Sequence, residues 1–255
     1  MLLQHATWPE VETYLESNKG IIVPIGSTEQ HGPSGLIGTD ALTAEVIGQR
    51  LGEATGAFVA PTLNYGMAQH HMAFTGTITL KPSTMIAVTR DIVMSLVRHG
   101  FERIFFVNGH GGNMNSVKAA FSEVKSELGE AKVLRDGGSN HPPDDVRLEL
   151  HNWWTGEKTT ALRKSLYGDR EGYHATPSEV AVTWFSFPEQ KRDVALGPLE
   201  KVTRAYQGPE DFRKLFPDGR MGSDPSLATA EDGERLVFLA VDELAERYRQ
   251  FLGED

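Results

Sequence analysis

Two glycine-rich loops of this sequence carry side chains of the kind that bind divalent metal ions. The first contains Glu29-Gln30-His31-Gly32, and Asp40 arrives nine residues after His31. Side chains two positions apart in an extended segment project to the same side, so Glu29 and His31 can reach one ion or two adjacent ions. For this loop taken alone, the alternative is a solvated Glu29 and a His31 that only forms a turn hydrogen bond.

The second loop, Asn108-Gly109-His110-Gly111-Gly112-Asn113, follows the apolar run 103–107. Both loops come directly after predicted parallel strands, and the carboxyl ends of such strands form the edge where open α/β sheets bind ligands. The two loops are therefore expected to share one site. The competing interpretation is that the glycines make a sharp turn or an anion nest, with His110 as a bystander.

A third segment contains His174, Ser178 and Glu179. Ser178 is a candidate helix cap, which places Glu179 in the first helical turn, where a glutamate is ordinarily explained by the helix dipole. His174 is a candidate catalytic residue and Glu179 a candidate ligand, but the spacing alone does not separate these roles from structural ones.

Composition narrows the chemistry. The chain has no cysteine, so any metal must be bound by nitrogen and oxygen, a ligand set that suits zinc, manganese or iron(II). With 25 Lys+Arg against 35 Asp+Glu, the formal net charge of −10 argues against nucleic acid and anionic membranes as partners. No run approaches the roughly 18 apolar residues of a membrane span, and the first residues do not resemble a signal peptide, so we expect a cytoplasmic protein.

The elements that must position these loops alternate between helix and strand. A helix beginning near Trp8 ends before Gly20, and the periodicity then predicts strands over 21–25, 57–60, 103–107 and 131–134 and helices over 41–51, 82–98 and 113–128. This order predicts the α/β class, with a mainly parallel sheet flanked by helices. Residues 136–145 are expected to form a loop, either a flap or a linker, before helices over 178–185 and 229–251. The length of 255 residues favours a single domain, 1–255.

In order and spacing these motifs resemble the creatininase (creatinine amidohydrolase) family. The resemblance rests on the two loops with Asp40, on His174-Ala175 with Glu179, on the segment from His71 to Thr77, and on Gly222-Ser223-Asp224-Pro225. It spans about residues 20 to 235 of the chain. Any one motif is weak, but five in the right order are specific to the superfamily.

The resemblance implies a three-layer αβα fold and a dinuclear site, usually of zinc or manganese, often in a homohexamer. By position, Glu29 and His110 would bind one ion, His31 and Glu179 the other, and Asp40 would bridge them. A metal-bound water would hydrolyse a non-peptide C–N bond of a small molecule, and His174 would carry a proton to the leaving nitrogen. His71, Gly111, Gly112 and Trp154 would contact the substrate, Trp154 as an aromatic wall.

Two departures bear on the substrate. Creatinine-hydrolysing members carry a carboxylate ligand where this chain has Gly112, and many members have glutamate where it has His70, a residue whose role the sequence does not define. The His-Gly-Gly-Asn form resembles other branches, including formamide deformylases and a peptide-trimming enzyme. We therefore expect an amidohydrolase acting on a cyclic amide or a formamide, with creatinine hydrolysis as the alternative.

Two readings from outside this family remain as rivals. A serine hydrolase would need a Gly-x-Ser-x-Gly elbow, which this sequence does not contain, and nothing in the sequence indicates that Ser27 is activated. A non-catalytic module that binds an anion or small molecule without metal has no positive motif in its favour. Metal content separates this module from the enzyme.

Overall fold

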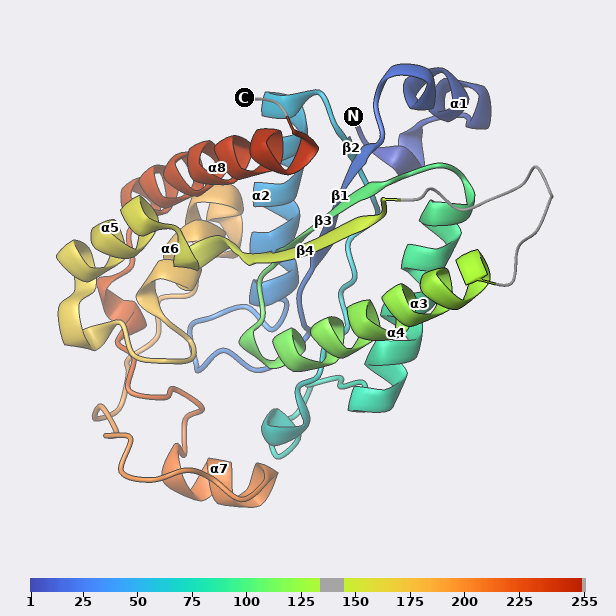
Figure 1. Cartoon of the computed structure of the whole chain (residues 1–255). Helices are drawn as coiled ribbons and strands as arrows, with labels where there is room; N and C mark the ends of the chain where they lie inside the picture. Colours follow the sequence, from blue (N-terminus) through green and yellow to red (C-terminus); the bar gives the residue numbers. More distant parts are fainter. Residues whose placement is uncertain (134–144, 254–255) are drawn as a thin grey trace.

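The computed structural model describes residues 1–133 and 145–253. Within these ranges a four-stranded sheet has the order β2-β1-β3-β4, and all its pairings are parallel. The strands are β1 Gly20–Ile25, β2 Phe58–Val59, β3 Arg103–Asn108 and β4 Arg147–Asn152. Because every strand runs in the same direction, their carboxyl ends meet at a single edge of the sheet (Figure 1).

Helices cover both faces of this sheet, which confirms the three-layer α/β fold (Figure 1). On one face lie α2, α5, α6 and α8, and on the other lie α3 and α4, with α1 beside them. The helices are α1 Trp8–Ser17, α2 Thr39–Thr55, α3 Pro82–Arg98, α4 Met114–Val133, α5 Glu157–Tyr167, α6 Pro177–Ser186, α7 Pro209–Leu215 and α8 Ala230–Leu252.

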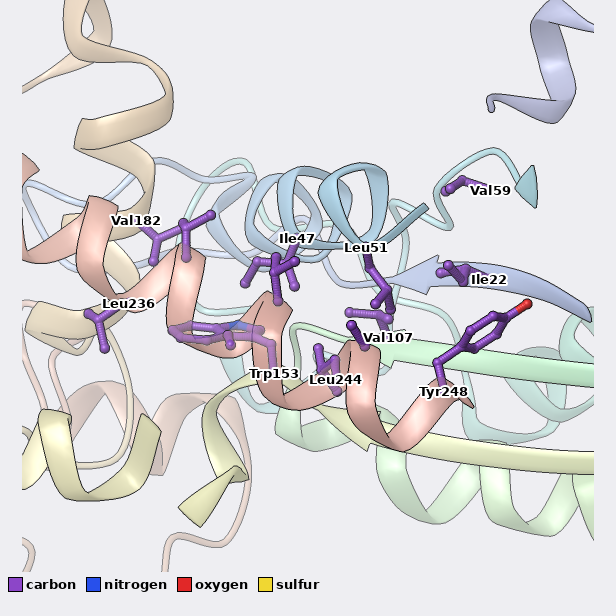
Figure 2. Packing of buried hydrophobic residues seen from close by; sticks show 14 of the residues in the cluster. Ile22, Ile47, Leu51, Val59, Val107, Trp153, Val182, Leu236, Leu244 and Tyr248 are labelled. Carbon is purple, nitrogen blue, oxygen red and sulfur yellow. The ribbon is translucent and has the colours of Figure 1, made fainter. Parts of the chain in front are cut away.

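Successive side chains of a strand point to opposite faces of the sheet. Because β1 and β3 are nearly continuous apolar runs, both faces of the sheet are apolar along these strands. In β1, Ile22 packs with α2 and α8, whereas Ile21 and Val23 pack with α3 and α4. Figure 2 shows the first of these two cores, in which Leu244 of α8 lies close to Val107 of β3. A strand buried on both faces reads as a continuous apolar run, which is why β1 and β3 are visible in the sequence.

Most of the predicted elements are confirmed with small shifts at their ends. The helix predicted over 82–98 has those bounds, and the strands predicted over 21–25 and 103–107 are each one residue longer. The helix predicted over 178–185 begins at Pro177, and its cap is Thr176 rather than Ser178. The predicted loop 136–145 lies outside the described residues except for Asp145, which is in a turn.

The strand predicted over 131–134 is wrong. Residues 131–133 continue α4, and Leu134 lies outside the described residues. The fourth strand is β4 instead, which lies at the edge of the sheet beside β3. Its alternating Leu148, Glu149, Leu150 and His151 place apolar and polar side chains on opposite faces. Ala131 and Lys132 are good helix formers, which favours the continuation of α4 over a new strand. In the part of the chain that the structure describes, no helix is long and apolar enough to cross a membrane.

The start of α5 generates a prediction about stability. Glu243 of α8 accepts hydrogen bonds from the amides of Lys158 and Thr159 at 2.7 and 2.9 Å and from the Thr159 hydroxyl at 2.6 Å, and so caps this helix from outside. Loss of a helix cap costs about 1 kcal/mol. We expect Glu243→Ala to lower the free energy of unfolding by about that amount in denaturant titration, whereas Glu246→Ala, at an exposed position of the same helix, should change it little.

The same carboxylate should make this difference depend on pH. Burial alone would raise the pKa of Glu243, but the hydrogen bonds from Thr159 and Lys158 outweigh it and lower the pKa. A carboxyl group with a lowered folded-state pKa stabilises the fold above its unfolded pKa of about 4.3 and loses that contribution as the pH falls. The gap between wild type and Glu243→Ala should therefore shrink in acid; a gap that widened below pH 4 would contradict the capping role.

Candidate metal centre

The parallel sheet brings the two metal-binding loops together at its carboxyl edge. Ile25, the last residue of β1, is in register with Asn108, the last residue of β3. The next residue in each chain segment is a glycine, and a Cβ atom at Gly26 or Gly109 would overlap the backbone of Asp40 and Ala41. The first turn of α2 can therefore sit directly against both loops, and this contact delivers Asp40 to the site.

Asp40 lies between two imidazoles that come from different loops. Its Oδ1 atom is 2.9 Å from His31 Nε2, and its Oδ2 atom is 2.9 Å from His110 Nδ1. Glu29 lies beside this group, with Oε2 3.3 Å from His110 Nε2 and 2.7 Å from the Ser27 hydroxyl that donates to it. All four of these acidic and imidazole side chains are buried. The structure thus brings together the predicted residues Glu29, His31, Asp40 and His110.

The chemistry of this donor set fits divalent cations. Glu29 Oε1, His31 Nε2 and Asp40 Oδ2 are buried and, among the described residues, make no hydrogen bond of normal geometry; each faces only a carboxylate or an imidazole of the same cluster. Glu29, His31 and Asp40 each offer a ligand atom within 4.8 Å of the others. Buried polar atoms without partners are costly unless a bound ion or ligand satisfies them, and imidazole with carboxylate is a common ligand set for zinc, manganese and iron.

Backbone carbonyl groups select which nitrogen of each imidazole faces the site. His31 Nδ1 lies 3.1 Å from the carbonyl oxygen of Glu29, and His110 Nε2 lies 3.0 Å from that of Met67. A carbonyl can only accept, so these nitrogens donate, and His31 Nε2 and His110 Nδ1 are left facing Asp40. Hydrogen bonding of the outer nitrogen is the usual way in which proteins orient a metal-ligating histidine.

In the metal-free protein, the carboxylates and imidazoles of this cluster shift one another's pKa values. Burial raises the pKa of Glu29 to about 6. Burial opposes the charged form of the imidazoles as well, but Asp40 outweighs it for His31 and raises its pKa to about 10. For His110, Glu29 and Asp40 together raise the pKa to about 9. Burial likewise opposes ionised Asp40, yet His31 and His110 keep its pKa well below the ordinary range. Positive charge therefore resides between the carboxylates even without a metal.

The third predicted segment reaches the same site from α6. His174 is held by an antiparallel pairing with Met221, and its carbonyl oxygen also accepts from the Ser223 hydroxyl. Ala175 adopts φ 55°, an unusual value for a residue with a side chain, as the backbone turns toward α6. Glu179 forms a capping box in which Oε2 accepts from the amide and hydroxyl of Thr176 at 2.9 and 2.8 Å.

Glu179 interacts electrostatically with both His31 and Asp40, so its carboxylate belongs to the same cluster of charges. Burial raises the pKa of Glu179. Both capping hydrogen bonds use Oε2, and no described residue donates a hydrogen bond to Oε1. The capping box is therefore compatible with a second task for Glu179 as a ligand through its other oxygen.

A cavity of about 310 Å³ opens above these side chains. The predicted substrate-contacting residues His71, Gly111, Gly112 and Trp154 all line it, together with His174 and Glu179. His70, whose role the sequence does not define, also lines the cavity and stacks on Tyr206 with ring centroids 5.2 Å apart. The predicted residues are thus spatial neighbours, although they come from five separate segments.

The sequence did not point to several other residues at the site. Arg163 and Tyr206 line the cavity, and Gln30 packs beneath His71 and His174. Arg163 and Tyr206 lie in segments without a motif, so no local signal marks them. Gln30 stands between two candidate ligands in the sequence, which was the one available signal.

Comparison with known proteins agrees with this fold. The creatininase family, described as creatinine amidohydrolase, matches residues 4–248. A creatinine amidohydrolase from Pseudomonas putida is 28% identical over 96% of this chain and 94% of its own length. A mycofactocin precursor peptide peptidase from Mycolicibacterium smegmatis is 35% identical over 91% of this chain and 85% of its own.

Solved structures of creatininase superpose closely on this chain. A mutant described as Zn–Zn type has a TM-score of 0.85 at 25% identity, covering 98% of this chain and 97% of the other. A structure described as creatininase Mn has a TM-score of 0.84 at the same identity and coverage.

A parallel sheet between two helical layers, with carboxylates and imidazoles gathered at its carboxyl edge, is suited to bind metal ions, and the named relatives of this chain are hydrolases. The chain belongs to the creatininase family.

The close approach of Gly109 to α2 can be tested directly. We expect Gly109→Ala to push the Asp40 backbone away from His110 and to lower both the thermal midpoint and the amount of zinc retained after gel filtration. Gly111→Ala is the matched control, because a Cβ atom there meets nothing within 4 Å. Equal zinc retention and equal midpoints in the two variants would show that the contact with Asp40 does not position the site.

Proposed function

We propose that this chain is a metal-dependent amidohydrolase that cleaves a non-peptide C–N bond, in a cyclic amide or a formamide, at a dinuclear centre. The observation that carries the proposal is the placement of Asp40, whose two carboxylate oxygens each face a different imidazole at 2.9 Å. A carboxylate with a different imidazole at each oxygen is suited to be shared by two ions, each of which also binds one histidine.

The proposed ligands divide into two sets. Glu29 and His110 would hold one ion, His31 and Glu179 would hold the other, and Asp40 would be shared by both. Zinc is the first choice, with manganese or iron as alternatives, because one imidazole and carboxylate oxygens per ion suit all three metals. The Zn–Zn and Mn forms of solved creatininases support zinc and manganese.

When bound, a pair of divalent cations lowers the pKa of water toward neutrality and polarises the carbonyl group that is attacked. The residues of the chain do the rest. His174 Nδ1 faces Glu29 Oε1 at 3.7 Å and is placed to carry a proton to the leaving nitrogen. Gly111, Gly112 and Trp154 line the cavity. In this proposal the amides of the two glycines donate to an oxyanion, and Trp154 offers an aromatic surface to a planar substrate.

The cavity and Gly112 together support a small substrate other than creatinine. A volume of about 310 Å³ lies in the size range of small-molecule sites. A Cβ atom at Gly112 would overlap the ring of His110 and the carbonyl oxygen of Met67, so the carboxylate ligand of creatinine-hydrolysing members cannot be placed here without moving His110. Creatinine hydrolysis, which the Pseudomonas relative is named for, is the alternative.

A panel of substrates tests the proposed reaction. Zinc-loaded protein should release formate or open a ring when it is supplied with N-formyl compounds, lactams or cyclic ureas, whereas creatinine and a short peptide should react more slowly. Faster cleavage of the peptide would assign the chain to the activity that its 35%-identical relative is named for, and would overturn the proposed substrate class.

Metal content tests the bridging role. Asp40→Ala should lose both ions, because a bridging ligand serves both, and plasma emission spectrometry of protein purified without chelator measures this directly. Asp91→Ala, which removes an exposed carboxylate from α3, should retain the wild-type content. An Asp40→Ala protein that kept two ions and full activity would refute the assignment, and a wild type that binds none would favour the non-catalytic module.

A different result is expected when His174 is replaced. His174→Asn should keep the metal content of the wild type, since the proposed ligands remain, but should lower kcat by about 10²–10⁴-fold, the usual contribution of a positioned proton carrier. Loss of metal in this variant, or an unchanged kcat, would contradict the proposed role. The hexamer implied by the family resemblance stays a prediction that a mass measurement in solution can check.

A further inference from the structure

Gln30 is a buried amide that contacts two histidines of the site at once. Its Nε2 atom lies 2.9 Å from His71 Nδ1 and 2.9 Å from His174 Nε2. The orientation of this amide is fixed at both ends, because Oε1 accepts from the amide of Gly32 at 2.8 Å and Nε2 donates to the carbonyl oxygen of Gly219 at 3.0 Å. Gly219 packs so closely on the amide that a Cβ atom there would overlap it.

This orientation determines where the proton of His71 lies. The Gln30 Nε2 atom can only donate, so His71 Nδ1 must be an unprotonated acceptor. A neutral imidazole that accepts at one nitrogen carries its proton on the other, which places a hydrogen on His71 Nε2. That nitrogen faces Glu29 Oε1 at 3.2 Å, and so His71 presents an N–H group to the site.

His174 faces the site with its unprotonated nitrogen, unlike His71. Its Nε2 atom lies 2.7 Å from the backbone carbonyl oxygen of Gln30, which can only accept, so Nε2 carries the proton. The two hydrogens of the Gln30 amide are used by Gly219 and His71, so none is required by His174. His174 Nδ1 is therefore an unprotonated nitrogen facing the site.

We infer that Gln30 is a positioning residue that sets these two stacked imidazoles in opposite senses, His71 as a hydrogen-bond donor and His174 as an acceptor. Their ring centroids are 4.1 Å apart. The inference rests on the proposed function, and it decides whether His71 is a metal ligand, which its residue type alone does not. Glu29, His71 and His174 each offer an atom within 4.8 Å of the others and could be taken for a metal site. With a hydrogen on Nε2, His71 is not a ligand, and its N–H is free to hold Glu29 or an oxygen atom of the substrate.

Neutron diffraction from deuterated, zinc-loaded crystals reads these proton positions without any measurement of turnover. The expected result is deuterium on Nε2 of both His71 and His174 and none on Nδ1 of either. Deuterium on His71 Nδ1, or zinc within about 2.1 Å of His71 Nε2, would overturn the inference. The proposed function fails on a different result, the absence of amide hydrolysis by the zinc-loaded wild type, so the two failures are distinguishable.

A variant tests whether Gln30 is responsible. Gln30→Met keeps a side chain of similar size but removes the amide; we expect zinc content close to wild type, a fall in kcat of about tenfold or more, corresponding to one lost hydrogen bond, and a smaller change in KM. Gln69→Met, at an exposed position, is the matched control. An unchanged kcat in a folded Gln30→Met protein would overturn the positioning role, and if that variant does not fold, the neutron result on the wild type decides.

Discussion

Two carboxylates buried side by side are the constraint on which the rest of this structure depends. Glu29 and Asp40 are both almost fully inaccessible to solvent, and an ionised carboxylate is very costly to bury unless it is paired. His31 and His110 supply the compensating charge in the metal-free chain, and divalent cations are the natural replacement for those protons. Ionised carboxylates at this site therefore need positive charge beside them, which the proposed metal ions would supply.

The fold meets this constraint by combining a parallel sheet with glycines at two strand ends. Parallel strands place the loops after β1 and β3 side by side, and Gly26 and Gly109 let the first turn of α2 approach their backbone. Asp40 thus arrives on a rigid helix rather than on a loop. On the other side, Thr176 caps α6 through Glu179, so the local signal that starts this helix also positions a proposed ligand. Glu179 therefore both stabilises the start of α6 and is a proposed metal ligand.

The sequence predicts those parts of the structure that depend on local patterns. The apolar runs of β1 and β3 locate the sheet edge, and Glu29, His31 and His110 could be singled out because they follow these runs closely. Asp40 could be added because it comes nine residues after His31. Glu179 could not be separated from an ordinary first-turn glutamate by spacing, and only the family resemblance singled it out. Arg163 and Tyr206 reach the site through tertiary contacts, which leave no periodic pattern in the sequence. Gln30 lies between two candidate ligands, but its contacts with His71 and His174 exist only in the folded chain. The strand predicted over 131–134 failed because α4 continues through residues 131–133, while β4, with its alternating pattern, lies further along the chain.

The central claim, that this cluster of residues is a dinuclear metal centre, is tested most directly by anomalous diffraction from zinc-soaked crystals at the zinc absorption edge. The account predicts two peaks about 3.5 Å apart, one beside Glu29 and His110 and one beside His31 and Glu179, with Asp40 between them. A single peak, or a peak bound by His71 and His174 instead, would contradict it.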